Sequence, residues 1–118
     1  MIDFDGEVYE NLKYMGMEIP KHTQETLNSY LLHGFQPGGF VSAMLACDLE
    51  RALYCADTGN RQMFWAIAMW IREHAPAGSW GSYEAIDVWC LDQNGQRTAY
   101  RTEVEKQAVW KRLQKVTA

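Results

Sequence analysis

Nine consecutive apolar residues, from Met63 to Ile71, form the longest hydrophobic run of the 118-residue sequence. A helix that crosses a bilayer needs about 20 such residues, so we expect this run inside a folded domain. A helix at a protein surface has one polar face, whereas this run is apolar all round. It therefore predicts a helix that either lies at the centre of the fold or offers its second face to another chain.

Helix signals flank this run on its N-terminal side. Pro20 and Gly34 are typical of the start and the stop of a first helix. A second helix is predicted from about Gly39 to Cys55, and the polar residues 57–60 break it. The apolar stripe predicted for this second helix comprises Val41, Leu45, Leu49, Ala52, Leu53 and Ala56. The third predicted helix contains the apolar run and ends near His74, since a proline follows two residues later.

The two ends of the chain are less regular. Residues 1–19 mix two hydrophobic periods, and we expect a short strand or an irregular arm followed by a weak helical turn. Ser82 is a suitable N-cap for a short helix to about Leu91. Asn94–Gly95 then predicts a turn, with a hairpin of 88–92 and 97–101 as the alternative. A capping-box spacing at Thr102 opens a last helix.

These signals predict a mainly α, single-domain protein of about five helices that spans residues 1–118. The 15 acidic and 11 basic residues give a net charge of −4, which argues against retention on nucleic acid or anionic lipid by bulk charge. The N-terminus has no pattern of a signal peptide, and the three cysteines are typical of free thiols. We therefore expect a soluble cytoplasmic protein.

Charge is uneven along the chain. The first 20 residues are acidic, whereas 96–118 contain six basic and two acidic side chains. Two interpretations remain open for this asymmetry. The first is structural: the two ends of the chain lie near one another, or the basic helix complements its own dipole. The second is functional: the basic end is a contact patch for an acidic partner. The second interpretation leaves a nucleic-acid-associated regulator as an alternative function.

No pattern of catalytic or metal-ligating residues stands out. His22, His33 and His74 share no ligand spacing, and the cysteines Cys47, Cys55 and Cys90 are too far apart in sequence for a zinc motif. Neither a nucleophile elbow nor a phosphate-binding loop motif is present. We predict that the protein is not an enzyme and that it has no cofactor and no metal.

One loop is a candidate anion site. Its glycines and hydroxyls precede a helix, where free N–H groups favour a phosphate or carboxylate. The candidate residues are Gly78, Ser79, Gly81 and Ser82, with Arg61 as a nearby cation. The structural alternative is that Ser82 caps the helix, the glycines form the turn and Trp80 fills the core. A second polar residue, Asp48, lies in an apolar stretch and predicts either a clamp between loops or a ligand-facing carboxylate.

Aromatic residues indicate where a partner protein could bind. Five tryptophans in a small helical chain are typical of core and interface anchors. Trp65 is the best interface candidate, because it points away from the Ile67–Ile71 side of its helix. The predicted interface comprises Trp65, Met69 and Trp110, with Arg101, Lys111 and Arg112 at its rim.

Several short segments together resemble a family of small phage and prophage proteins. The family patterns are G-x-P-P-G-G-F-L, N-D-L, A-D-x-x-N and P-x-x-x-W-G-S. The corresponding segments here are Gln36-Pro37-Gly38-Gly39-Phe40-Val41, Asp48-Leu49, Ala56-Asp57 with Asn60, and Pro76 with Trp80-Gly81-Ser82. The similarity covers about residues 22–90, with Gln36 and Cys47 as departures, and leaves the ends 1–19 and 92–118 unmatched. It carries over no catalytic residue.

The resemblance implies a phage accessory protein that acts in the host cytoplasm. Together with the aromatic residues, it leads us to expect a protein that binds and inhibits a bacterial host or defence protein by occlusion. The alternative is a small-ligand binder, such as a sponge for a nucleotide signal at the 78–82 loop. Self-association through the third helix is compatible with both.

Overall fold

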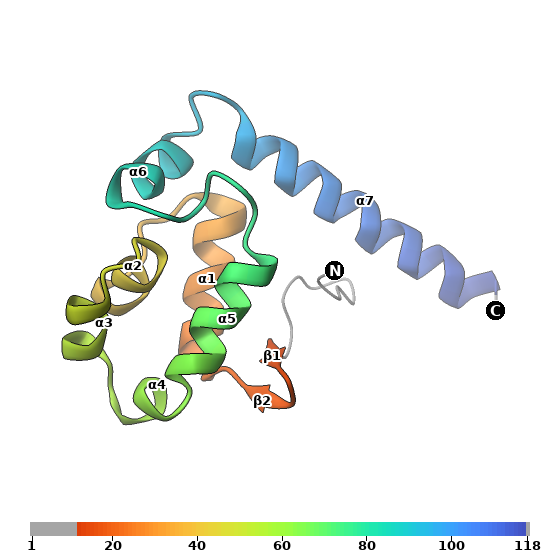
Figure 1. Ribbon diagram of the computed structural model, residues 1–118. Coiled ribbons are helices and arrows are strands. Elements are labelled where there is room, and N and C mark those ends of the chain that lie inside the picture. Colours follow the sequence, from red (N-terminus) through yellow and green to blue (C-terminus); the bar gives the residue numbers. More distant parts are fainter. Residues whose placement is uncertain (1–11, 118) are drawn as a thin grey trace.

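The computed structural model describes residues 12–117, with side chains described for residues 12–107. This part of the chain forms seven helices and one two-stranded hairpin, which confirms the predicted mainly α fold (Figure 1). The elements are β1 (Lys13–Tyr14), β2 (Met17–Glu18), α1 (Lys21–His33), α2 (Gly39–Leu45), α3 (Leu49–Cys55), α4 (Thr58–Gln62), α5 (Phe64–His74), α6 (Tyr83–Leu91) and α7 (Gln96–Thr117). The helices outnumber the predicted five because the second predicted helix is divided into α2 and α3, and because α4 forms largely from the segment 57–60 that was predicted to break the helix.

The N-terminal hairpin replaces the helical turn predicted before Pro20. Strands β1 and β2 pair antiparallel, with Tyr14 opposite Met17. Met15 and Gly16 between them both have positive φ, 49° and 79°. Two such residues form the tight turn that matches the twist of a hairpin, and a helical turn needs negative φ at both. The predicted arm over residues 1–11 lies outside the described residues.

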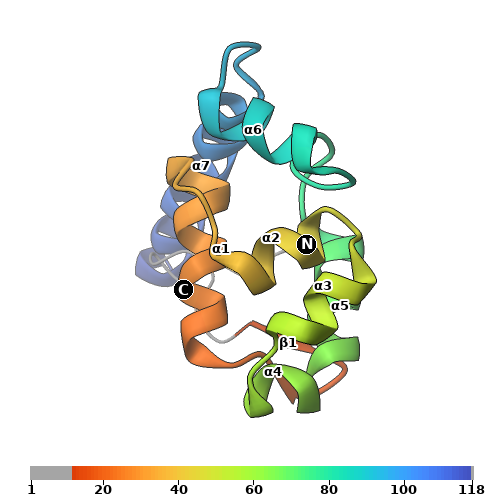
Figure 2. The same cartoon turned by 90° about the vertical axis from the view of Figure 1, so that its left-hand side faces the viewer.

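Helix α1 is the central element of the fold. Its buried residues are Thr23, Gln24, Leu27, Tyr30, Leu31 and Leu32. Helices α2 and α6 pack against it on one side, and α7 runs along another side (Figure 2). Gly34 ends α1 in the left-handed conformation, as its position after the last apolar residues predicts. The first predicted helix is confirmed.

The second predicted helix is broken in the middle. The chain turns at Cys47, whose φ is 62°, and restarts at Asp48, whose Oδ1 accepts a hydrogen bond from the Arg51 backbone N–H at 3.3 Å. Asp48 is therefore the N-cap of α3. The break rotates the predicted apolar stripe out of register, so Leu49 is 62% and Leu53 49% exposed. The prediction of one continuous helix was wrong because a capping carboxylate competes with helix propagation.

Helix α5 contains most of the long apolar run and is separated from α4 at Met63. Asp57 caps α4 through a 2.8 Å hydrogen bond from the Asn60 backbone N–H to its Oδ1. One side of α5 is buried, and its buried residues are Ala66, Ile67, Trp70 and Ile71. The opposite side includes Trp65, which is 52% exposed. The helix thus has a buried face and a second apolar face that is partly open to solvent.

The C-terminal region is helical on both sides of the Asn94–Gly95 turn. Ser82 caps α6 as predicted, since its Oγ accepts from the Ala85 backbone N–H at 3.0 Å. Asp92 then ends α6 in the left-handed conformation, and its Oδ1 accepts from the backbone N–H of Arg97 at 2.9 Å. This carboxylate lets α7 begin at Gln96 rather than at Thr102. The alternative hairpin of 88–92 and 97–101 is wrong.

Helix α7 packs against α1 and α6 near its start and then runs away from the helical body (Figure 1). Val104 of α7 is buried. In the described part of the chain, no helix has the length and hydropathy required to cross a membrane.

Candidate functional site

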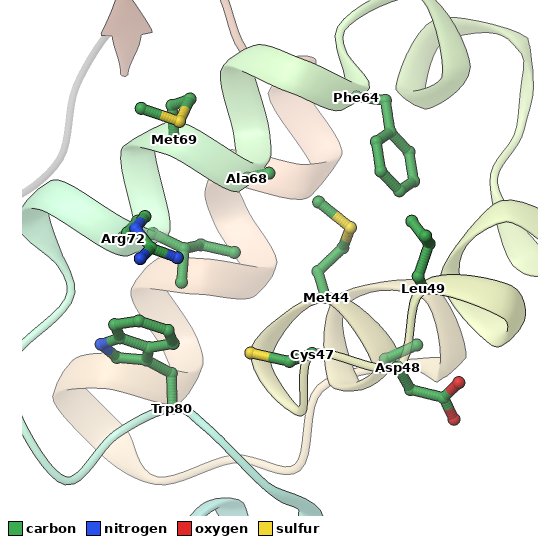
Figure 3. Close-up of a pocket in the computed structure, with 11 residues that line it drawn as sticks. Met44, Cys47, Asp48, Leu49, Phe64, Ala68, Met69, Arg72 and Trp80 are labelled. Atoms are coloured by element: carbon green, nitrogen blue, oxygen red, sulfur yellow. The ribbon is translucent and has the colours of Figure 1, made fainter.

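An apolar groove lies between the α2–α3 segment and α5, and we call it the α3–α5 groove (Figure 3). Its volume is about 220 Å³. The groove is lined by Ala43, Met44, Cys47, Asp48, Leu49, Phe64, Ala68, Met69, Ile71, Arg72 and Trp80. Phe64 and Leu49 lie at one end, and Arg72 and Trp80 at the other. Only Asp48 and Arg72 of these residues carry a charge.

The open side of the groove continues onto the exposed surface of α3. Leu49 belongs to the groove, and Leu53 lies one helical turn further along the same side of α3. Both side chains are exposed to solvent, as is Tyr54 beside them. On α5, Trp65, Met69 and Arg72 follow one another at the spacing of a helix face. A concentration of exposed apolar side chains around a groove is typical of a surface that binds a partner.

Hydrogen bonds fix the polar edge of the groove. The Tyr83 hydroxyl donates to Asp48 Oδ2 at 2.6 Å, and the Arg51 guanidinium donates to the Tyr83 hydroxyl at 3.0 Å. The bond from Tyr83 is the main reason why the pKa of Asp48 lies below its usual value. This network connects the start of α3 to the start of α6. Asp48 is therefore the clamp between segments that its sequence context predicts, although it lies at the surface and its donors are Tyr83 and Arg51.

The loop before α6 positions Trp80 at the end of the groove. The buried Tyr30 hydroxyl of α1 donates to the Ser79 carbonyl oxygen at 2.6 Å. The Gly81 backbone N–H donates to the Leu45 carbonyl oxygen at 2.7 Å. These two bonds attach the loop to α1 and to the end of α2. Trp80 between them is held by the core of the protein rather than by loop contacts alone.

The polar groups of the predicted anion site are bonded within the protein. The Ser79 hydroxyl donates to the Pro76 carbonyl oxygen at 2.6 Å, the Gly81 N–H is bonded to Leu45, and Ser82 caps α6. Gly78 has a positive φ of 91°, as expected for a turn. Arg61 lies on α4, at the other end of the molecule from this loop (Figure 1). The geometry agrees with the alternative in which Ser82 caps the helix and the glycines form the turn. Ligand binding at this loop stays a prediction.

The residues predicted to form one interface lie on two elements. Trp65 and Met69 are on α5. Met69 lines the groove, and the Trp65 ring packs edge-to-face with the Tyr14 ring, with 5.1 Å between the ring centroids. Arg101 is on α7 and pairs with Glu105 at 3.1 Å. Trp110, Lys111 and Arg112 are also on α7, but their side chains lie outside the described residues. Helix α7 lies on the opposite side of α1 from α3 and α5 (Figure 2), the helices that form the groove, so the structure does not bring these two groups together.

The short sequence segments between residues 36 and 82 that are quoted above contain several helix caps. Asp48, Asp57 and Ser82 each cap a helix through a side-chain oxygen. Asn60 is buried, and its Oδ1 accepts from the buried Thr23 hydroxyl at 2.6 Å. His22 lies beside this pair, with its Nε2 3.2 Å from Asp57 Oδ2. These motif residues therefore join α1 to α4 and define where helices begin.

Sequence reasoning did not find the groove. Leu49 and Leu53 were predicted to be in the core, and the contacts of Asp48 with Tyr83 and Arg51 were not predicted. The available signal was Asp48, because a capping residue before Leu49 starts a new helix and changes which side chains face outward. Within residues 12–107, no three His, Cys, Asp or Glu side chains are grouped closely enough to hold a metal ion.

Comparisons of the chain with protein-family models, with curated proteins and with solved structures gave no match.

Proposed function

We propose that this protein is a non-enzymatic phage accessory protein that binds a bacterial host or defence protein and inhibits it by occlusion, using the α3–α5 groove as its contact surface. The observation that carries the proposal is the position of Leu49, Leu53 and Trp65, three large apolar side chains that are about half exposed beside an apolar groove. Interface anchors are typically aromatic or aliphatic groups of this kind. The resemblance to phage proteins supports a bacterial protein as the partner.

The polar edge of the groove fits this role as well. Asp48, Tyr83 and Arg51 form a connected network at the surface, so the edge is ordered before a partner arrives. A preorganised surface loses little conformational entropy on binding. Partner residues seated over the groove would be excluded from their own functional contacts, which is inhibition by occlusion.

The test combines capture with quantitative binding. A protein captured from bacterial lysate is purified, and its affinity is measured by calorimetry for the wild type and for variants Leu49→Asp and Trp65→Ala. We expect each variant to bind at least tenfold more weakly, because apolar anchors dominate interface energies. Leu91→Asp on α6 is the matched control, since Leu91 is 66% exposed and outside the groove.

Two results would contradict the proposal. The first is that no protein binds the wild type with measurable affinity. The second is that Leu49→Asp and Leu91→Asp weaken binding equally, which would place the contact surface elsewhere.

A further inference from the structure

The strongest unexplained group at the groove is the Arg72 guanidinium. Arg72 is exposed at the end of the groove that Trp80 closes (Figure 3). In the part of the chain with described side chains, no hydrogen bond or ion pair engages it. The arginines Arg51, Arg97 and Arg101, by contrast, each donate to a hydroxyl, a carbonyl or a carboxylate oxygen of the protein.

The nearby carboxylates are already engaged. Asp48 accepts from Tyr83 and from the Arg51 N–H, and Figure 3 shows its carboxylate pointing away from the groove. Glu73, next to Arg72 in sequence, accepts from the Tyr14 hydroxyl at 2.8 Å. Of the two charged side chains that line the groove, Arg72 is therefore the one whose charged group has no partner among the described residues and is open to a ligand.

The size of the groove limits what enters it. Its volume of about 220 Å³ is smaller than the roughly 300–1,000 Å³ of typical small-molecule pockets. Met44 and Met69 line it, and methionine side chains adapt to groups of different shape. A single large apolar side chain matches this space better than a nucleotide or a cofactor does.

From these observations we infer that the α3–α5 groove takes an apolar side chain followed by a carboxylate, so that the partner contacts it through an acidic amphipathic helix. Residues three or four apart on a helix lie on one face, which presents an apolar anchor and an Asp or Glu together. The anchor enters between Phe64 and Met44, and the carboxylate pairs with Arg72, whose planar fork matches carboxylate geometry. The inference rests on the proposed function and adds the chemistry of the partner to it.

The test uses defined probes in place of the partner. Isotope-labelled protein is titrated with 4-phenylbutyrate, with its neutral amide and with 4-phenylbutylamine, and binding is followed by NMR at the backbone amides of Met44 and Ala68 and the indole N–H of Trp80. We expect all shifts to map to the groove and the carboxylate to bind about two- to fivefold more tightly than the amide, the range expected for one exposed ion pair. The amine should bind most weakly.

Two variants isolate the role of Arg72. Arg72→Gln should remove the preference for the carboxylate over the amide while the amide still binds. Arg61→Gln is the matched control, because Arg61 is an exposed arginine on α4 outside the groove, and it should keep the preference. Both positions are exposed, and an unchanged spectrum away from the groove verifies the fold.

The possible failures are distinguishable. Equal binding of carboxylate and amide would overturn the acidic partner and leave the proposed function standing. Absence of groove shifts with all three probes would overturn the inference, whereas the proposed function is tested separately by the capture and calorimetry. Groove signals that change with protein concentration alone would show a second copy of this chain as the occupant and would overturn the inference.

Discussion

At the scale of single residues, two buried tyrosine hydroxyls have opposite situations. Tyr30 is fully buried and donates to the Ser79 carbonyl oxygen, whereas the buried hydroxyl of Tyr100 has no partner among the described residues. Burial raises the pKa of both phenols. A buried hydroxyl that is hydrogen-bonded stabilises the fold. A buried hydroxyl without a hydrogen bond destabilises it, because the lost hydration is not replaced.

We therefore expect opposite results from the same change at these two positions. Tyr30→Phe should lower the free energy of unfolding by about 1–2 kcal/mol, because the Ser79 carbonyl loses its donor. Tyr100→Phe should leave the free energy of unfolding unchanged or raise it by up to about 1 kcal/mol. Urea unfolding measures the free energy of unfolding of both variants. Equal losses of stability would contradict the conclusion that the Tyr30 hydroxyl is hydrogen-bonded and the Tyr100 hydroxyl is not.

The carboxylate of Asp92 makes stability dependent on pH. Its pKa is lowered, mainly because the Thr98 hydroxyl donates to it and also because the backbone N–H groups of Thr98 and Arg97 do. A carboxylate whose pKa is lower in the folded state stabilises the fold above its unfolded pKa of about 3.9, and this stability is lost as the pH falls through the folded pKa.

Asp92→Asn should therefore be less stable than the wild type at pH 7, and the difference should shrink as the pH falls below about 4. Urea unfolding over a series of pH values measures this. Thr98→Val removes the main hydrogen-bond donor to Asp92. It should therefore make the free energy of unfolding fall less steeply as the pH is lowered. A constant difference between Asp92→Asn and the wild type at all pH values would show that the charge has no role.

At the scale of elements, Arg97 joins the ends of three helices. From the first turn of α7 its guanidinium donates to the carbonyl oxygens of Trp89 at 3.2 Å and Cys90 at 3.4 Å in α6, and of Leu32 at 3.5 Å in α1. The last carbonyls of a helix lack partners within it, so these bonds satisfy groups that would otherwise be unpaired. The side chain of Arg97 is 17% exposed, so water replaces it poorly.

We expect Arg97→Met to lower the free energy of unfolding by about 2–3 kcal/mol, since three partly buried carbonyls lose a charged donor. Arg101→Met is the control. Arg101 is exposed and pairs with Glu105 on the same helix, a pair that contributes less than about 0.5 kcal/mol. Thermal and urea unfolding of both variants test the difference, and similar losses would mean that Arg97 acts only as a surface charge.

At the scale of the whole molecule, burial is concentrated in the elements that contact most others. Helix α1 has six buried residues and contacts α2, α6 and α7. Helices α3 and α4 each have a single buried residue in their spans, Ala52 and Asn60. Local opening is easiest where few side chains are buried. The groove thus has one wall, α5, with four buried residues, and one wall, α3, that opens locally more easily beyond its start, which Asp48 holds to Tyr83.

Native-state hydrogen exchange should follow this order. We expect the amides of α1 and of the buried side of α5 to exchange most slowly, and those of α3 and α4 to exchange faster by local opening. Exchange followed by NMR at pH 7 measures the protection of each helix. Protection of α3 equal to that of α1 would contradict the inference that this wall of the groove opens locally more easily.

Local signals predicted much of the fold. The starts and stops at Gly34, Pro76 and Ser82 depend on the backbone conformation and hydrogen bonds of a few neighbouring residues, so a sequence reveals them. Asp92 and Asp48 were harder, since each competes with a pattern that also favours a continuous helix or a turn. The start of α7 and the break before α3 were missed for this reason.

The sequence by itself determined that the chain folds as a mainly helical protein and that the run from Met63 to Ile71 has more apolar surface than one core face uses. Only the tertiary structure decided that this second face, with α3, lines a groove, and that the basic α7 lies on the other side of α1. The physical reason is the distance along the chain between the residues that decide each feature. Caps and turns are decided by neighbours in sequence, whereas exposure of Leu49 or Trp65 depends on which distant segments pack beside them.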